Sequence, residues 1–266
     1  MSQIENSISS IDLTDKSVLL RVDFNVPLKG SELLDDERLI RALPTINFIA
    51  ENAKSLKIIS HLGRPEETGL VQDKFSLKPV AKKLAELLGK EVNLVNSLKE
   101  LKSLKNISML ENIRFYKGEK QNEDKLSKAL AETADVFVMD AFGTAHRKQA
   151  STFGVTKFVK EACVGLLVEE ELKALEKIID SPEKPLLGII GGSKISTKMK
   201  VLESLTRHVD HLIIGGALAN TCLKALGKNI GKSLYEEDFI ELAKTIIKNK
   251  KILLPSYVVV TKGRDA

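Results

Sequence analysis

A glycine turn followed by two lysines is the clearest candidate for phosphate chemistry in this chain. Residues 186–198 read LLGIIGGSKISTK, which is an apolar strand, a glycine turn, and then Lys194 and Lys198. Exposed backbone N–H groups and nearby positive charge are what a bound phosphate requires. The segment is not a Walker A loop, because Ser193 replaces its second glycine and Ile195 replaces the Ser or Thr that holds Mg²⁺. It predicts a site for a nucleotide or another phosphorylated anion, built differently from that of the common NTPases.

The spacing of the two lysines predicts that they share a helix face. Lys198 follows Lys194 by four residues, in a helix expected from Ser196 to Arg207. For a random pair of lysines at this spacing, a solvent-exposed pair without function is as common as a phosphate-binding pair. The preceding glycine turn favours the functional interpretation here. A second turn, Gly215-Gly216-Ala217, follows the next strand. Glycines there can serve tight turns alone, but two such turns on neighbouring strands indicate a nucleotide.

Polar side chains follow the strands expected in the first half of the chain. Ligands of open parallel sheets bind beyond the carboxyl ends of the strands, so these positions are candidates for a binding site. Arginine forks bind carboxylate and phosphate bidentately, which suits a small ligand that carries both groups. The candidates are Asp23 and Asn25 in RVDFNVP, His61 and Arg64 in SHLGRP, Asn112 and Arg114 in LLENIRF, and Asp140, His146 and Arg147 in MDAFGTAHR, with Arg38 at the first helix.

Each candidate also has a structural explanation. Asp23 alone is better explained as a turn cap, and His146 alone as a hydrogen-bonded structural histidine. Three arginines in three independent loops are harder to explain structurally. Other charged residues are interpreted as structural: Asp35 and Asp36 as helix N-terminal charges, and Arg41, Lys82 and Lys83 as solvated helix faces.

Short runs of Val, Ile and Leu alternate with segments of helical period, which predicts βαβ units and parallel sheets. Pro44 is expected to kink or restart the first helix. The expected strands are 17–22, 56–60, 92–95, 107–110, 135–139, 186–190, 211–214, 252–254 and 258–260, and the expected helices are 36–52, 77–88, 123–133, 166–179, 196–207, 217–226 and 236–249.

Two series of such units predict two domains. The helix over 166–179 carries an apolar stripe and is followed by Ser-Pro-Glu-Lys-Pro, which ends it. We therefore expect a first domain over 1–165, a connecting helix over 166–181, and a second domain over 182–266. The predicted fold class is α/β, with two Rossmann-like domains that have parallel sheets and are joined by the connecting helix.

Composition is that of an ordinary globular protein. The chain has 266 residues, 43% of them hydrophobic and 29% charged, and a net charge of +5, which suits an anionic small ligand rather than nucleic acid. Cys163 and Cys222 are isolated from each other in sequence and are expected to be buried thiols in a reducing compartment. No leader or apolar run long enough to span a membrane is seen, so the expected location is the cytoplasm.

Six motifs occur in one order along the chain: RVDFNVP, SHLGRP, LLENIRF, DAFGTAHR, GGSKISTK and IIGGALANT. Together they resemble the phosphoglycerate kinase family, from about Ile11 to the end of the chain. The resemblance implies a 3-phosphoglycerate site formed by Asp23, Asn25, Arg38, His61, Leu62, Gly63, Arg64, Arg114 and Arg147. It implies a nucleotide site formed by Gly192, Lys194, Lys198, Gly215, Gly216 and Ala217, where Ala217 replaces a glycine of many members.

The resemblance also implies a reaction and its partners. The implied reaction is reversible phosphoryl transfer between 1,3-bisphosphoglycerate with ADP and 3-phosphoglycerate with ATP. The implied protein is a cytoplasmic monomer that bends at a hinge and binds neither nucleic acid nor membrane. Arg38 and Lys194 are the implied catalytic residues. Mg²⁺ is implied as the cofactor, with its main ligand expected beyond residue 266, and no metal ligand is assigned in this chain.

The end of the chain departs from the family pattern. Family members continue past KGRDA into a Gly-Gly-Gly-Asp turn, a glutamate near the ribose and a C-terminal tail, so the second domain is expected to be incomplete, with exposed sheet edges and helix faces. The alternative is a truncated, inactive phosphoglycerate-binding fragment, which would bind 3-phosphoglycerate weakly or not at all. A dinucleotide oxidoreductase needs GxGxxG and an acidic residue, which neither turn provides. A non-catalytic anion-binding module has no use for the two lysines with their glycine turns.

Overall fold

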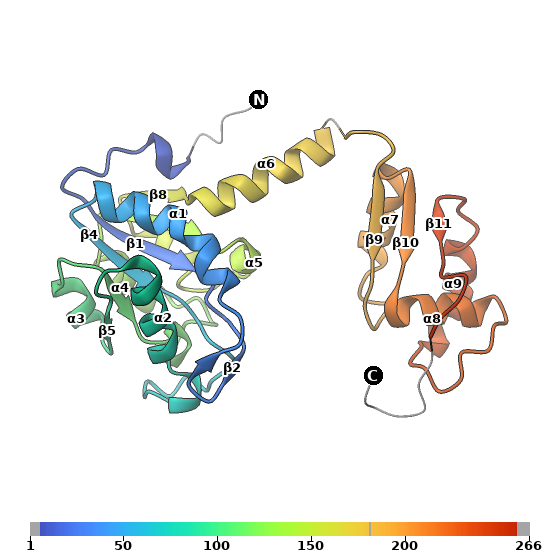
Figure 1. The fold of residues 1–266 in the computed structure, drawn as a ribbon, viewed down its shortest axis with the longest axis horizontal. Coiled ribbons are helices and arrows are strands. Elements are labelled where there is room, and N and C mark those ends of the chain that lie inside the picture. Colours follow the sequence, from blue (N-terminus) through green and yellow to red (C-terminus); the bar gives the residue numbers. More distant parts are fainter. Residues whose placement is uncertain (1–5, 181, 260–266) are drawn as a thin grey trace. The chain divides into compact units, whose positions relative to one another are not determined.

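The computed structural model describes residues 6–180 and 182–259. The chain divides into two compact units, Met1–Ala174 and Leu175–Ala266. The boundary between them falls inside helix α6 (Leu166–Asp180), which covers the helix expected over 166–179 (Figure 1).

The first unit is built on a six-stranded sheet in which every pair of neighbours is parallel. The strand order is β5-β6-β4-β1-β7-β8, so the first strand lies inside the sheet and the fold is doubly wound. Leu20 lies opposite Ile58 on one side and Val138 on the other. The strands are β1 (Ser17–Val22), β4 (Ser55–Ile59), β5 (Asn93–Val95), β6 (Ser108–Leu110), β7 (Val136–Asp140) and β8 (Glu161–Val164).

Alternate side chains of the central strands form two hydrophobic cores, one on each face of the sheet. Val18 and Leu20 pack with helices α1 (Glu37–Asn52) and α2 (Lys78–Leu88), whereas Leu19 packs with α3 (Leu98–Ser103) and α4 (Asp124–Ala131). All three side chains are fully buried. Each buried side chain of this size contributes about 2 kcal/mol, so β1 is fixed from both faces and its carboxyl end is a rigid platform.

The first unit also holds elements that the sequence patterns did not predict. Strand β8 and helix α3 are short and were missed, as were helix α5 (Phe142–Ala145) and the antiparallel hairpin of β2 (Leu28–Lys29) and β3 (Glu32–Leu33). Pro44 does not restart the first helix, because α1 runs through it without a break. Among its described residues, from 6 onward, the unit also has four 3₁₀ helices: η1 (Ile8–Ser10), η2 (Asp73–Phe75), η3 (Ile113–Phe115) and η4 (Gly154–Lys157).

The second unit has a three-stranded parallel sheet in the order β11-β10-β9. Its core lies on one face of this sheet and includes Ile190, Leu212 and Ile214. On the other side Leu187 and Ile189 are 49% and 72% exposed, so apolar surface is open on a sheet face rather than only at an edge. The elements are β9 (Leu187–Ile190), α7 (Met199–His208), β10 (His211–Ile214), α8 (Gly216–Ala225), η5 (Glu237–Phe239), α9 (Ile240–Ile246) and β11 (Ile252–Leu253).

The predictions for the last part of the second unit are wrong in detail. The helix expected over 236–249 is a short 3₁₀ helix followed by the shorter α9. The strand expected over 258–260 is absent at Val258 and Val259, and Val260 lies outside the described residues.

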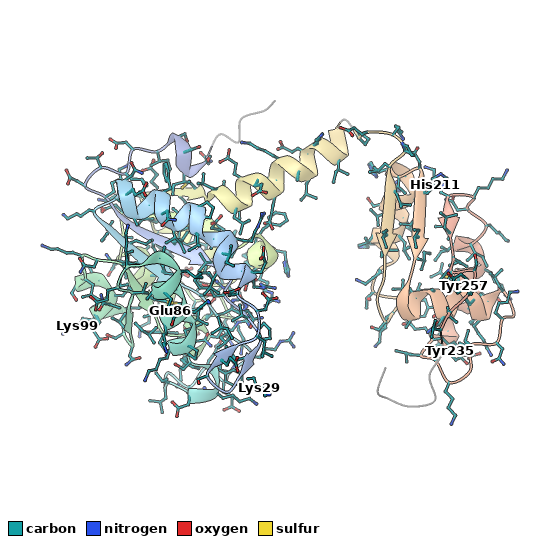
Figure 2. All side chains as sticks on the ribbon, viewed as in Figure 1. Lys29, Glu86, Lys99, His211, Tyr235 and Tyr257 are labelled. Atoms are coloured by element: carbon teal, nitrogen blue, oxygen red, sulfur yellow. The ribbon has the colours of Figure 1, made fainter. Side chains whose placement is uncertain are left out.

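Charged side chains such as Lys29, Glu86 and Lys99 extend outward from the first unit (Figure 2). Cys163 and Cys222 are buried and free, as predicted, and burial raises the pKa of their thiols to about 12 and about 11. Within the described part of the chain, no helix combines the length and the apolar character needed to cross a membrane.

Candidate active site

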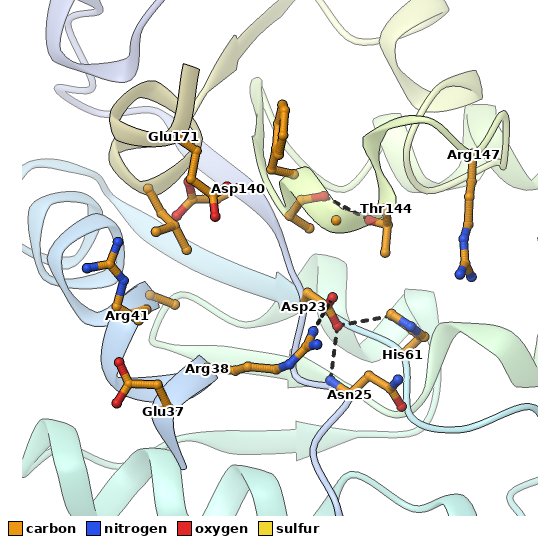
Figure 3. Close-up of a pocket in the computed structure, with 15 residues that line it drawn as sticks. Asp23, Asn25, Glu37, Arg38, Arg41, His61, Asp140, Thr144, Arg147 and Glu171 are labelled. Carbon is orange, nitrogen blue, oxygen red and sulfur yellow. Dashed lines mark hydrogen bonds and ion pairs between the residues drawn. The ribbon is translucent and has the colours of Figure 1, made fainter. Parts of the chain in front are cut away.

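A cavity of about 400 Å³ lies at the carboxyl edge of the six-stranded sheet (Figure 3). Its walls come from the segments that follow β1, β4 and β7, from the start of α1, and from the start of α6. The structure therefore brings together six of the residues predicted from the sequence: Asp23, Asn25, Arg38, His61, Asp140 and Arg147. The other polar residues of the lining are Glu37, Arg41, Thr144 and Glu171.

Asp23 is the centre of the hydrogen bonds in this cavity. Its carboxylate forms an ion pair with Arg38 and accepts the backbone N–H of Asn25 at 3.1 Å (Figure 3). One of its oxygens lies 3.9 Å from Nδ1 of His61. The bond to Asn25 is the turn cap considered above, so Asp23 both shapes the turn after β1 and places Arg38.

His61 is buried and uncharged. Only 2% of it is exposed, and burial together with the positive charges of the surrounding arginines, Arg21 foremost, lowers its pKa to about 2. A neutral imidazole donates through one ring nitrogen only. The cavity is thus lined by positive charge from the half-exposed Arg38 and by the buried neutral ring of His61.

The loop after His61 is held by side chains from two other strand ends. Asn25 Oδ1 accepts the N–H of Gly63 at 2.8 Å, and Arg114 donates to the Gly63 carbonyl at 2.6 Å. Gly63 has φ +58°, and a Cβ there would lie 2.5 Å from the Phe75 ring, so this position requires glycine.

Four predicted ligand residues, Leu62, Gly63, Arg64 and Arg114, lie outside the cavity lining. Arg114 is only 4% exposed and supports the loop, whereas Arg64 is exposed on it. The loop geometry depends on a further residue, Asn112, whose amide donates to the Leu62 carbonyl at 2.7 Å.

Asp140 joins the cavity to α6. One carboxylate oxygen accepts the N–H of Val168, in the first turn of α6, at 3.0 Å, and the other is buried without a hydrogen-bond partner. Burial raises the pKa of this carboxyl, and hydrogen bonds from Thr45 and from the backbone of α6 oppose the shift. Arg41, interpreted above as a solvated face, lines the cavity and pairs with Glu170 at 3.1 Å. Both contacts tie α6 to the predicted site.

The two glycine turns of the second unit are in contact with each other. A Cβ on Gly216 would lie 3.2 Å from the backbone N and O of Gly192, and Leu218 N donates to the Gly192 carbonyl at 3.0 Å. Gly216 has φ +63° and begins α8, so the N-terminus of a ten-residue helix opens beside the first turn. Lys198 passes close by, since a Cβ on Gly192 would lie 2.7 Å from its Cε. Backbone donors, a helix N-terminus and an ammonium group are the parts of a phosphate site.

The predicted relation between Lys194 and Lys198 is wrong. Helix α7 begins at Met199, so Lys198 is its N-cap and Lys194 lies in the preceding loop. Two contacts explain the late start: Ile195 is fully buried in the core, and Ser196 is held by Glu236, which accepts from its N–H at 3.1 Å and its hydroxyl at 2.6 Å. Ile195, which breaks the Walker pattern, is therefore a core anchor.

Two buried residues behind the cavity, Arg21 and Glu119, are not among the residues predicted from the sequence. Arg21 lies inside β1, where alternation indicates only a core position, and Glu119 lies in a turn after η3. For Arg21, the one sequence feature that points to a special role is a charged residue within an apolar strand, and no such feature marks Glu119.

For Mg²⁺ the described residues offer little. In residues 6–180 and 182–259, no three His, Cys, Asp or Glu side chains are grouped so as to hold a metal ion. The glycine turns supply donors that fit phosphate but no free carboxylate, since Glu236 is engaged by Ser196. No step is therefore assigned to a metal bound by this part of the chain.

Comparisons with known proteins agree with the motifs. The family model described as phosphoglycerate kinase matches residues 8–266. The phosphoglycerate kinase of Francisella philomiragia is 49% identical over 249 residues, and that of Francisella tularensis subsp. novicida is 47% identical. Each alignment covers 93% of this chain but 63% of the relative, so the chain spans less than two thirds of the length of these proteins.

Solved structures agree as well. The phosphoglycerate kinase of Coxiella burnetii matches with a TM-score of 0.81 at 47% identity, over 94% of this chain and 65% of that one. The enzyme of Pyrococcus horikoshii matches with a TM-score of 0.80 at 28% identity, over 94% of this chain and 67% of that one. These likenesses confirm the predicted α/β class with two Rossmann-like domains. The chain belongs to the phosphoglycerate kinase family.

Proposed function

We propose that this protein catalyses reversible phosphoryl transfer between 1,3-bisphosphoglycerate with ADP and 3-phosphoglycerate with ATP, a step of glycolysis and gluconeogenesis. Family membership supports the reaction class. The observation that carries the proposal is the cavity of the first unit, in which Asp23, Asn25, Arg38, His61 and Arg147 surround a space for a small anion.

The lining suits 3-phosphoglycerate, which carries a carboxylate, a hydroxyl and a phosphate. Arg38 and Arg147 would bind the anionic groups, and Asn25 and Asp23 would meet the hydroxyl. Arg64 would add a charge from the exposed side of the loop. Leu62, Gly63 and Arg114 would act by holding that loop, in keeping with the hydrogen bonds of Gly63.

The glycine turns of the second unit would bind ATP or ADP. The phosphates would accept hydrogen bonds from the backbone N–H groups of the turns, which include Gly192, Gly215, Gly216 and Ala217. Lys198 would supply positive charge to them. Mg²⁺ would neutralise phosphate charge when the nucleotide is bound. Lys194, exposed in its loop, would meet the transferring phosphoryl group.

The reaction needs no general base, because the accepting carboxylate is already ionised at neutral pH. Catalysis would consist of positioning and of stabilising a metaphosphate-like transition state, with Arg38 and Lys194 each supplying about 3 kcal/mol. These residues belong to different units, so the reaction requires closure about α6. The proposed enzyme acts on small molecules as a monomer in the cytoplasm and binds neither nucleic acid nor membrane.

A second candidate is a phosphoglycerate-binding protein without turnover. The observation in its favour is that every residue of the cavity lining, from Asp23 to Glu171, belongs to the first unit. Binding therefore needs no part of the nucleotide unit, and weak binding of 3-phosphoglycerate is expected even where transfer is absent.

The test is calorimetric titration of the full chain with 3-phosphoglycerate, alongside a coupled assay with ATP. Binding that Arg147→Met weakens and Lys194→Met leaves unchanged supports the substrate site, and turnover then separates the enzyme from the binding protein. Absence of 3-phosphoglycerate binding would contradict both candidates. Inorganic phosphate serves as the control ligand, because it lacks the carboxylate.

A further inference from the structure

Four buried side chains form a connected chain behind the cavity. Arg21, Glu119 and Ser151 are fully buried, and His61 is 2% exposed. They come from β1, from the turn after η3, from the segment after α5, and from the segment after β4. Only His61 lines the cavity, so the other three act on a ligand, if at all, through His61.

The contact between Arg21 and His61 decides which ring nitrogen carries the proton. Nη2 of Arg21 lies 3.1 Å from Nδ1 of His61. A guanidinium group has donors and no acceptor, so Nδ1 must accept this hydrogen bond. The ring proton of the neutral imidazole then lies on Nε2, the nitrogen for which no described residue is a partner.

A competing arrangement is close at hand. Oδ1 of Asp23 lies 3.9 Å from the same Nδ1. If Nδ1 carried a proton, that proton would pair with the Asp23 carboxylate, and the ring would either lose its Nε2 proton or become a cation. Asp23 and Arg21 therefore favour opposite protonation of one nitrogen, and the shorter contact is with Arg21.

Arg21 is held in place by three bonds. Its Nη1 donates to the carbonyl of Val22, Nε donates to Ser151 Oγ at 3.2 Å, and Nη2 is committed to His61. A guanidinium group fixed at all three nitrogens has no rotational freedom left.

Ser151 in turn is held by Glu119. The carboxylate accepts the Ser151 hydroxyl at 2.6 Å and its backbone N–H at 3.0 Å. With its proton directed to Glu119, the hydroxyl oxygen of Ser151 presents a lone pair to Arg21. Burial raises the pKa of Glu119, and the hydrogen bonds from Ser151 and the charge of Arg21 oppose that shift, so the buried carboxylate and the buried guanidinium favour each other's charged form.

We propose that Glu119, Ser151 and Arg21 are positioning residues, which hold His61 as the neutral tautomer with its proton on Nε2, ready to donate to an anionic oxygen of the ligand. The ligand assignment rests on the proposed function, whereas the tautomer does not. The arrangement gives the cavity a donor that adds no charge, beside arginines that supply the charge.

The experiment is long-range ¹H–¹⁵N correlation NMR of the histidine rings in the ligand-free full chain at neutral pH. The two neutral tautomers and the imidazolium give different patterns, and His61→Gln identifies the signals of His61 among the four histidines. We expect the Nε2–H pattern in the wild type. Arg21→Met should convert it to the Nδ1–H pattern or to the imidazolium, and should weaken 3-phosphoglycerate binding about tenfold.

Two comparisons make the result decisive. Arg41→Met removes a cavity arginine that pairs with Glu170 and not with His61, and it should leave the Nε2–H pattern unchanged. Because Arg21→Met leaves the Glu119 carboxylate buried without its counter-charge, the charge-balanced Arg21→Met/Glu119→Gln is measured in parallel, with the same expected loss of the pattern.

The proposal is overturned if wild-type His61 shows the Nδ1–H or imidazolium pattern, a result that needs no variant to fold. It is also overturned if the Nε2–H pattern survives in either variant that lacks Arg21. If the tautomer behaves as expected but the wild type fails to bind 3-phosphoglycerate, the positioning role stands and the proposed function fails.

Discussion

Arg38 on the first turn of α1 is paired with Asp23 just beyond the end of β1, so one ion pair joins a helix to a strand end at the cavity (Figure 3). Arg38 is about half exposed, and such a pair contributes no more than about 1 kcal/mol. That weakness is compatible with the proposed role of Arg38, because the ion pair with Asp23 costs little to break when a ligand binds.

Arg38→Ala should lower kcat far more than it weakens 3-phosphoglycerate binding. The guanidinium is proposed to act on charge that develops in transfer, so a loss of about 3 kcal/mol, or roughly a hundredfold in kcat, is expected. Steady-state kinetics of the active protein measures this. A change confined to KM would contradict the transition-state role.

Gly216→Ala should weaken ADP binding. Its φ of +63° is strained for alanine, by about 1 kcal/mol, and the new Cβ would press on Gly192 at 3.2 Å. Gly227→Ala is the matched control, since φ there is +75° and a Cβ would meet nothing within 4 Å. Calorimetry should show that ADP binding is roughly tenfold weaker in Gly216→Ala and unchanged in Gly227→Ala. Equal effects would show that strain, and not the contact of the two turns, is responsible.

Asn112→Ala should destabilise the first unit by about 2 kcal/mol. The buried amide donates to the carbonyls of Leu62 and Phe75 at 2.7 and 2.9 Å, and removing it leaves both without that donor. Asn52→Ala removes an exposed bond to the Phe48 carbonyl and should cost less than about 0.5 kcal/mol. Hydrogen exchange of the β1 amides reports on this unit alone, and similar costs for both variants would contradict the prediction.

His61 should make the stability of the first unit depend on pH. The pKa of His61 in the folded chain, about 2, lies below the ordinary value of 6.5. Below pH 6.5 the unfolded chain therefore binds a proton at His61 that the folded chain does not bind. The contribution of neutral His61 to the free energy of unfolding is complete above about pH 6.5. It is lost as the pH falls toward 2, by at most about 1.4 kcal/mol per pH unit.

His61→Gln should remove this dependence. The stability difference between wild type and variant should change by about 2 kcal/mol between about pH 6.5 and 4.5, because the other histidines are present in both proteins and cancel. Hydrogen exchange of the β1 amides at the two pH values measures it. A difference that stays constant would show that His61 is protonated in the folded chain.

Much of the fold follows from sequence periodicity. Strand β1 is found at its predicted bounds, and Leu19 and Leu20 face opposite cores as alternation requires. Strand β8 was missed because Glu161–Val164 is short and begins with a charged residue. The start of α7 was misplaced because tertiary contacts of Ile195 and Ser196, which no local pattern reveals, hold the preceding residues in a turn.

The cavity was predictable to the extent that strand ends define it. Asp23 and His61 follow β1 and β4 and meet there, since parallel strands end at one edge. Arg114 also follows a strand, yet it turns to the Gly63 carbonyl, and only side-chain geometry shows this. Arg21 could not be found by the same rule, because it acts from within a strand.

The most direct test of the account is an amide chemical-shift titration of the full chain with 3-phosphoglycerate. Saturable shifts should centre on the backbone amides of Asn25, Arg38, His61 and Thr144, which surround the cavity. Arg147→Met should reduce the affinity, and the amides of Gly192 and Gly216 should not respond. No saturable shift at the cavity, or shifts centred on the glycine turns instead, would contradict the proposed substrate site.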